Sequence, residues 1–416
     1  MRPRPPQIAT TSARSKCLGK KPPKKHGNHC CISAMPCVNS PRPRSLPSQF
    51  WTNPIPAPSS ELGAGTTSGD ASMKYRHILA TAYGPPEVLH VFESEVPEPA
   101  LGEIRVRVLA AGVAWGDVAR RQAALPAYPP PPFPLGYDVV GVVDKLGAGV
   151  TLFSVGQCVA GLTFAVDAEA GTYRLFGYSE VVCGLARMFV PIPNHLDPVA
   201  AVCLVLNYLT AYQILHYDAT AQAGETVLVH GGGGGVGTAL LQLGRLMGLR
   251  MYATGSSSKQ GLIQELGAKP IDYTAQDFVE VMRRETPDGV GIVIDPIGGE
   301  YVERSYGLLR PNGRLIVYGL SSMTGEDVAQ NAGAEIERIN AMNDRDPAKL
   351  VKFFAGVDDE SDHYHADLNA LFDLLAAGKI LPIVARRLRL EEAPLAHHLL
   401  ETRQVGGKVV LDLTQA

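Results

Sequence analysis

The chain lacks several features that would each point to a particular class of protein. No uninterrupted apolar run reaches the roughly 20 residues that a membrane-spanning helix needs, and no apolar segment near the N-terminus has the character of a secretory signal. Acidic residues are absent from the first 60 positions of the 416-residue chain. The first two absences predict a cytoplasmic protein without a transmembrane segment.

The acid-free N-terminal segment carries ten Lys and Arg residues together with many Pro and Ser residues. Such a composition cannot bury enough apolar surface to offset chain entropy, so residues 1–72 are predicted to be a disordered basic leader. Three readings stay open: a mitochondrial or plastid transit peptide, a leader without function, or a start set too early, with Met73 as the effective start.

The remaining residues are acidic rather than basic. Removing the ten bases of the leader from the total of 38, and Glu61 and Asp70 from the total of 41 acids, leaves 28 bases and 39 acids in residues 73–416. The resulting net charge of −11 argues against a partner made of nucleic acid.

Cysteine and histidine are too scattered to predict a metal site. The cysteines after the leader stand singly among apolar residues and are interpreted as buried free thiols: Cys158, Cys183 and Cys203. Two pairs of histidines have no third ligand at a suitable spacing and are interpreted as exposed residues of helices or loops: His363 with His365, and His397 with His398.

Two patterns divide the chain from Met73 onward. Short β-branched runs, such as EIRVRVLAAGV at 103–113, alternate with Gly, Pro and Asp turns and predict a barrel-like β-rich domain. After residue 197, apolar strands and helices alternate, which is typical of a doubly wound parallel sheet. The predicted fold class is therefore α/β, with a β-rich domain and a Rossmann domain.

The stretch VLVHGGGGGVGTALLQLGRLMG at 227–248 places five glycines between a predicted strand and an amphipathic helix. Gly232, Gly234 and Gly237 match the G-x-G-x-x-G fingerprint. In it, the first glycine permits a tight turn, the second admits a pyrophosphate, and the third lets the helix pack closely on the strand. The phosphates would face the positive end of the helix. Because a flexible linker seldom lies inside a βαβ unit, we predict a dinucleotide site.

The end of the next strand selects the dinucleotide. An NAD site normally has a carboxylate there for the ribose 2′-hydroxyl, but this chain has ATGSSSKQ at 253–260. Small hydroxyls and an ammonium can bind a 2′-phosphate that a carboxylate would repel. The sequence therefore predicts NADPH, bound by Thr254, Ser256 and Lys259, with a hydroxyl or a stacking face from Tyr273.

Several ordered motifs carry a family resemblance over essentially all of residues 73–416. LTAYQILHYDATAQAGETVLVHGGGGGVGTALLQLGRLMG, GYDVVGVVDKLGAGV, VIDPIGGE, GRLIVYGL and AHHLLETRQVGGKVVLDL resemble the medium-chain dehydrogenase/reductase superfamily, in its zinc-independent quinone oxidoreductase and enoyl reductase branch. The resemblance implies a GroES-like catalytic domain at 73–205, completed by 379–416, and a Rossmann NADP-binding domain at 206–378. It also implies a homodimer.

The resemblance excludes the zinc-dependent relatives. Their metal needs a Cys and a following His-Glu pair, whereas this chain has GVAWGDV at 112–118 and GYD at 136–138 in those places. Asp117 and Asp138 are expected to fix the geometry of strand ends, and Asp295 to support a loop near the cofactor. We therefore predict no metal ligand.

A hydride donor without a metal favours a small-molecule substrate with an electrophilic carbonyl: an enone, a quinone or an enoyl thioester. The resemblance places Thr210 beside the nicotinamide and adds four cofactor contacts: Gly235, Val236, Gly319 and Lys408. Tyr128 is the candidate proton donor, and packing within its proline-rich loop is the alternative. Two further readings stay open: a dedicated enoyl reductase of a biosynthetic pathway, and a vesicle amine transport protein-like, lipid- or membrane-associated protein with little turnover.

Overall fold

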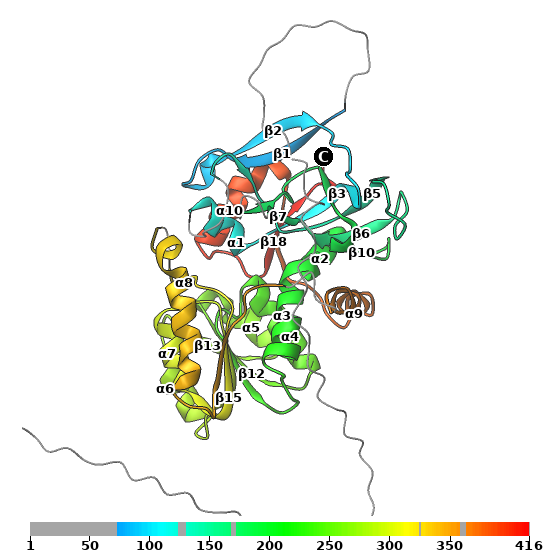
Figure 1. Ribbon diagram of the computed structural model, residues 1–416. Helices are drawn as coiled ribbons and strands as arrows, with labels where there is room; N and C mark the ends of the chain where they lie inside the picture. Colours follow the sequence, from blue (N-terminus) through cyan, green and yellow to red (C-terminus); the bar gives the residue numbers. More distant parts are fainter. Residues whose placement is uncertain (1–72, 124–129, 168–171, 324–325, 358–362, 416) are drawn as a thin grey trace, which may run out of the picture. The chain divides into compact units, whose positions relative to one another are not determined.

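A computed structural model describes residues 73–123, 130–167, 172–323, 326–357 and 363–415 (Figure 1). The predicted leader and the candidate proton donor Tyr128 lie outside these residues. Within them, the strands gather into two main sheets of different construction, one mixed and one entirely parallel.

The β-rich part contains the largest sheet and two smaller ones. Its strands are β1 (Lys74–Ala80), β2 (Leu89–Glu95), β3 (Glu103–Val113), β4 (Phe133–Pro134), β5 (Asp138–Leu146), β6 (Cys158–Leu162), β7 (Phe164–Asp167), β8 (Thr172–Leu175), β9 (Val181–Leu185), β10 (Phe189–Pro191), β17 (Val384–Leu388) and β18 (Lys408–Asp412). The largest sheet has the order β10-β6-β5-β3-β18-β17, with β9 also paired to β3; β2-β1-β4 and β7-β8 form the smaller sheets. Ile104, Val106 and Val108 alternate along β3 and are buried, as expected for side chains that point to the core face of a strand.

The parallel sheet occupies the middle of the chain. Its strands are β11 (Thr226–Val229), β12 (Arg250–Gly255), β13 (Lys269–Asp272), β14 (Val290–Asp295), β15 (Leu309–Val317) and β16 (Leu350–Phe353). They follow the order β13-β12-β11-β14-β15-β16, and every neighbouring pair is parallel. This is the 3-2-1-4-5-6 order of a dinucleotide-binding sheet. All six residues of β14 are buried, because helices cover both faces of such a sheet.

Helices flank this sheet on its two faces. They are α4 (Gly235–Leu246), α5 (Gln260–Glu265), α6 (Phe278–Glu285), α7 (Glu300–Tyr306) and α8 (Glu326–Ala341). Outside this part of the sequence, α1 (Trp115–Arg121) precedes it, and α9 (Tyr364–Ala376) and α10 (Ala393–Glu401) follow it. In Figure 1, α6, α7 and α8 lie together on one side of the sheet, and α4 lies on the other. The structure thus confirms the predicted α/β class with a doubly wound parallel sheet.

One continuous helical stretch, Pro198–Asp218, lies between the two sheets in the sequence. It joins α2 (Pro198–Cys203) and α3 (Leu209–Gln213) through π-helical segments. Asp197 caps its start, where the carboxylate accepts a hydrogen bond from the Val199 amide. The predicted domain boundary at 205/206 falls inside this stretch.

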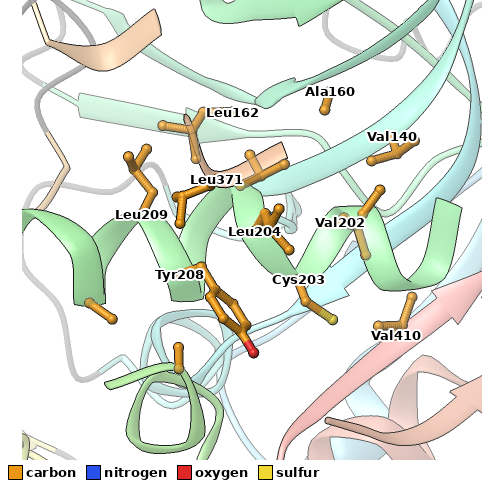
Figure 2. Close-up of a cluster of buried hydrophobic side chains, with 14 of the residues drawn as sticks. Val140, Ala160, Leu162, Val202, Cys203, Leu204, Tyr208, Leu209, Leu371 and Val410 are labelled. Carbon is orange, nitrogen blue, oxygen red and sulfur yellow. The ribbon is translucent and has the colours of Figure 1, made fainter. Parts of the chain in front are cut away.

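The same helical stretch is apolar and 21 residues long, so it could cross a membrane by length and composition alone. However, 78% of its most apolar window is buried inside this protein, as in a core helix. Figure 2 shows Leu204 and Leu209 of the stretch in one hydrophobic cluster with Leu162 of β6 and Leu371 of α9. The helix therefore joins elements of both parts of the chain in one core.

Candidate functional site

The predicted glycine fingerprint lies in the turn between β11 and α4. A Cβ atom added to Gly237 would lie 2.2 Å from the Gly231 carbonyl oxygen, and one added to Gly232 would lie 2.5 Å from the Ala253 Cβ. A Cβ added to Gly234 would meet only the Gly231 carbonyl oxygen, at 3.3 Å. The first and third glycines therefore serve close packing, whereas the second leaves space beside its Cα for a ligand to approach. These residues fit a bound dinucleotide, with the N-terminus of α4 facing its phosphates.

The C-terminal segment of the chain contacts this glycine turn directly. The Gly407 amide donates a hydrogen bond to the Gly233 carbonyl at 3.0 Å, and Gly234 and Gly407 form a parallel β-bridge. Because β18 follows immediately and belongs to the large mixed sheet, the two sheets meet at this turn. This contact places Lys408 beside the predicted pyrophosphate site.

Lys408 is buried in an ion pair that links two strands of the mixed sheet, β18 and β5, to the long helix. Its Nζ lies 2.8 Å from Asp138 Oδ2 and 3.4 Å from Asn207 Oδ1, and these residues are 3%, 0% and 7% exposed. Burial raises the pKa of Asp138, and the Lys408 ammonium opposes that rise. A Cβ atom at Gly112 would lie 2.4 Å from Asp138 Oδ2, so the pair needs a glycine in β3. Asp138 therefore does more than fix a strand end.

Asn207 connects this ion pair to the start of α4. A Cβ atom at Gly235 would lie 2.1 Å from Asn207 Nδ2, so this side chain lies against the glycine turn. Thr210 follows one turn later in α3 and is 7% exposed, and Val236 is half-buried at the first turn of α4. Asn207 is a polar contact that the sequence reasoning missed, because nothing local in LVLNYLTAY distinguishes it.

Thr254 and Ser256, both predicted to bind the cofactor, have different surroundings. Thr254 is 1% exposed, and its Oγ1 lies 3.2 Å from His230 Nδ1 and accepts a hydrogen bond from the Gly231 amide at 3.2 Å. Its hydroxyl thus supports the glycine turn from within. Ser256 is half-buried, and its Oγ lies 3.2 Å from Ser258 Oγ near the surface.

One cation, Lys259, packs against the glycine turn, and a second, Arg403, lies close enough to act on it electrostatically. The side-chain stem of Lys259 packs against Gly233, where an added Cβ would lie 2.6 Å from the lysine Cδ. Burial and the neighbouring charge of Arg403 lower the pKa of Lys259. Within the described part of the chain, neither side chain is paired with a carboxylate. The sequence reasoning missed Arg403, since it lies 144 positions after Lys259 along the chain.

The end of β13 contributes one predicted and one unpredicted residue. Tyr273 is 37% exposed, and its amide donates to the Gly255 carbonyl at 3.3 Å. Asp272 accepts hydrogen bonds from the Ser257 hydroxyl and from the Thr274 amide and hydroxyl, which lower its pKa. A carboxylate therefore lies near the residues predicted to bind the adenosine end of the cofactor. It belongs to β13 rather than β12, and it already accepts hydrogen bonds from two hydroxyl groups.

The loop after β14 lies against the predicted cofactor contact Gly319. A Cβ at Gly319 would lie 2.7 Å from the Pro296 carbonyl oxygen. Asp295 is buried and accepts hydrogen bonds from the Ile297 and Gly298 amides through Oδ1, while no partner of its Oδ2 lies among the described residues. Burial raises the pKa of Asp295 to about 7. This carboxylate thus supports the loop, as expected from the sequence.

Two interpretations of isolated residues need correction. His397 is fully buried rather than exposed, because α10 packs on α1 and directs this ring inward; His363, His365 and His398 are exposed as expected. Of the thiols described, only Cys203 is buried, whereas Cys158 and Cys183 are half-buried. Polarity and spacing of single residues do not reveal how the helix or strand that carries them is packed.

The fold and the glycine turn define a dinucleotide-binding protein. Two family models match the chain: an alcohol dehydrogenase GroES-like domain at residues 100–195 and a zinc-binding dehydrogenase model at residues 266–411. The chain is 30% identical over 367 residues to the human synaptic vesicle membrane protein VAT-1 homolog-like, covering 85% of each chain. It is 28% identical to rat quinone oxidoreductase, covering 81% of this chain and 97% of that protein.

Among solved structures, the chain is similar to Escherichia coli quinone oxidoreductase complexed with NADPH. The TM-score is 0.69 at 28% identity, with 81% of this chain and 99% of that chain covered. The chain belongs to the medium-chain dehydrogenase/reductase superfamily, in its quinone oxidoreductase-like branch. It is an enzyme of the quinone or enoyl reductase kind.

The zinc named in one family description does not fit the residues present. Ala114 and Tyr137 stand near the places of the Cys and His ligands, and Asp138 is already paired with Lys408. Among the residues that the structure describes, no group of three or more His, Cys, Asp or Glu side chains is placed to bind a metal ion. The residues in these places therefore do not fit a zinc ion.

Proposed function

We propose that this protein is an NADPH-dependent reductase that acts without zinc on conjugated carbonyl compounds: enones, quinones or enoyl thioesters. The observation that carries the proposal is the glycine turn, which has open space at Gly234 and packs against Lys259, with the charge of Arg403 acting on that lysine. A diphosphate fits the open backbone, and two cations suit an additional phosphate on the adenosine ribose.

Each part of the site has a proposed task. Gly232, Gly234, Gly235, Val236 and Gly237 would bind the diphosphate through the backbone, and Gly319 and Lys408 would contact the cofactor beside them. Ser256, Lys259, Arg403 and Tyr273 would bind its adenosine end. When bound, the cofactor would supply a hydride.

Thr210, one turn after Asn207 in the long helix, would orient the nicotinamide. Asp138 and Asn207 would hold the Lys408 ammonium in place where the mixed sheet meets the glycine turn. The protein would thereby align the two reactants and exclude water, which are the main contributions needed when the substrate is already electrophilic. Tyr128 remains the proposed proton donor.

Calorimetry with NADPH and NADH tests the cofactor. We expect Lys259→Ala to weaken NADPH binding about tenfold and to leave NADH binding unchanged, since only NADPH offers the extra phosphate. Lys145→Ala, which removes an exposed lysine of β5 paired with Glu98, is the matched control. If neither coenzyme gives heat, the proposal is wrong. Tighter binding of NADH than of NADPH would contradict only the preference for NADPH. It would favour Asp272 as the carboxylate that accepts a hydrogen bond from the ribose 2′-hydroxyl.

The substrate class needs a separate measurement. NADPH oxidation with a panel of enones, quinones and enoyl thioesters should show turnover with several members. If reduction requires an acyl chain bound to a carrier, the dedicated enoyl reductase replaces the broader reading.

A second candidate function is favoured by similarity to proteins named synaptic vesicle membrane protein. In that case the chain would bind lipid with little turnover. Co-sedimentation with phospholipid vesicles, together with inert substrates in the panel, would support this alternative and displace the first.

We also propose a homodimer that forms through the edge of the parallel sheet. β16 is the last strand in the sheet order, and no described strand of this chain covers its outer edge. Light scattering on the full chain would give the mass, and a monomer at micromolar concentration would contradict the proposal.

A further inference from the structure

A buried chain of side chains joins α10 to two loops beside the Lys408–Asp138 pair. Arg121 Nε lies 3.2 Å from His397 Nδ1, and His397 Nε2 lies 3.2 Å from the Tyr178 hydroxyl. The same hydroxyl lies 3.0 Å from Asp117 Oδ2. None of these four side chains is more than 1% exposed. The two contacts of His397 span 276 and 219 positions of sequence, so only the fold brings these side chains together.

The donors in this chain can be assigned from chemistry. A guanidinium only donates, so His397 Nδ1 must accept, and a neutral imidazole then carries its proton on Nε2. Burial and the adjacent Arg121 lower the pKa of His397 to about 3, which keeps the ring neutral. His397 Nε2 therefore donates to the Tyr178 oxygen, and the Tyr178 O–H donates to Asp117. The hydrogen bonds all run in one direction, toward the carboxylate.

Asp117 connects this chain of side-chain hydrogen bonds to the backbone of both loops. It accepts from the Ala114 amide at 2.9 Å and from the Gly136 amide at 2.8 Å. Ala114 lies between β3 and α1, and Gly136 lies two residues before Asp138. One carboxylate thus bridges the two segments, residues 112–118 and 133–138, that flank the buried ion pair.

We infer that His397, Tyr178 and Asp117 form a directed relay that holds these two loops, and through them Asp138 and Lys408, in the arrangement needed for reduction. The inference rests on the proposed function for the reaction, and the relay residues are positioning residues. The relay reaches the two loops through the backbone contacts of Asp117, so its effect on the reaction is indirect.

The relay should make activity depend on the protonation of Asp117, and therefore on pH. Burial raises the pKa of Asp117 to about 6, although its three hydrogen bonds oppose that rise. Ionised Asp117 accepts from all three donors, whereas a protonated carboxyl is a weaker acceptor and carries an O–H beside groups that already donate to it, which loosens the loop contacts. Activity should therefore fall as the pH drops below about 6. The other charged and titratable groups facing the relay are Asp138, Lys408, Tyr137, Arg121 and Glu401.

Tyr178→Phe is the main test, because it keeps the ring and removes the link between His397 and Asp117. Without the Tyr178 hydrogen bond, the carboxylate is less stable, so the acid limb of kcat should move up by about one pH unit. Hydrogen exchange of residues 112–118 and 133–138 should increase, while NADPH affinity changes less than about threefold.

Tyr364→Phe provides a matched control. Tyr364 is also 1% exposed, and its hydroxyl donates to the Met188 carbonyl at 2.9 Å and accepts from the Leu162 amide at 3.4 Å; both partners lie outside the two segments. This variant should move neither the acid limb nor the exchange of the two segments. A folded Tyr178→Phe protein with an unchanged acid limb and unchanged exchange would overturn the relay.

A second measurement needs no variant and no turnover. In the unaltered full chain, exchange of residues 112–118 and 133–138, corrected for intrinsic rates, should be faster at pH 5 than at pH 7 relative to the rest of β3 and β5. Equal protection at both pH values would overturn the inference. Failure of the enzyme to bind either coenzyme would refute the proposed function alone and leave this result intact.

Discussion

The two sheets contribute to the site in different ways. At the parallel sheet, the site is formed by the backbone of the turn between β11 and α4, and the glycines that shape this turn lie within six positions, from Gly232 to Gly237. At the mixed sheet, the site is formed by buried side chains whose partners are far apart in the sequence: Lys408 pairs with Asp138 across 270 positions. A site made of backbone can be read from a short stretch of sequence, whereas a network of side chains requires the fold.

The largest effect should come from the side-chain network. Lys408→Met would leave Asp138 charged in a dry site, because both residues are at most 3% exposed. We expect a loss of about 3–5 kcal/mol in the free energy of unfolding at pH 7.5, measured by urea denaturation.

The pH dependence of that variant identifies the cause. Without the ammonium, the pKa of Asp138 rises further above its unfolded value, so the carboxylate costs stability as the pH rises above about 4 and less below it. The loss should shrink at pH 5, and the double variant Asp138→Asn/Lys408→Met should recover part of it. An equal loss at both pH values would show that Lys408 acts by packing alone.

The sequence predicts the two sides of the site to different extents. The fingerprint glycines, Lys259 and the α/β class all follow from local patterns, because turn geometry and strand-helix alternation are encoded by neighbouring residues. Lys408 was named from a resemblance, but its partner Asp138 was expected only to shape a strand end. His397 was expected on the surface, since HH in an apolar helix does not show which histidine faces inward.

The next effect tests the backbone side. Gly237→Ala would force a Cβ to within 2.2 Å of the Gly231 carbonyl oxygen, a backbone atom that cannot move without opening the turn. We expect a loss of about 3 kcal/mol in unfolding free energy and no measurable NADPH binding. Gly261→Ala is the control: it lies in α5 with no atom within 4 Å of the added Cβ, and should gain about 0.5–1 kcal/mol. Two equal melting temperatures would refute the packing argument.

Thr254 combines the two kinds of contact, because its side chain supports the backbone of the glycine turn. Its Oγ1 accepts from the Gly231 amide and shares a hydrogen bond with His230 Nδ1, whose ring stays neutral because burial lowers its pKa to about 3. Thr254→Val keeps the shape but leaves both groups without a partner. We expect a cost of about 1–2 kcal/mol by urea unfolding, and Thr254→Ser, which retains the hydroxyl, should cost less than half as much. Equal costs would mean that the methyl group, not the hydrogen bonds, matters.

The smallest effect should come from Tyr273, whose exposed ring lies at the rim of the backbone site. Tyr273→Ala should weaken NADPH binding about threefold, or about 0.6 kcal/mol, in calorimetry, because a partly exposed aromatic contact is worth little. Tyr273→Phe then separates the two roles left open by the sequence. If the ring stacks on the adenine, Phe retains the affinity for both coenzymes; if the hydroxyl binds the 2′-phosphate, Phe loses affinity for NADPH alone. Unchanged binding of both coenzymes by Tyr273→Ala would remove this residue from the site and leave Lys259 and Arg403 to recognise the phosphate.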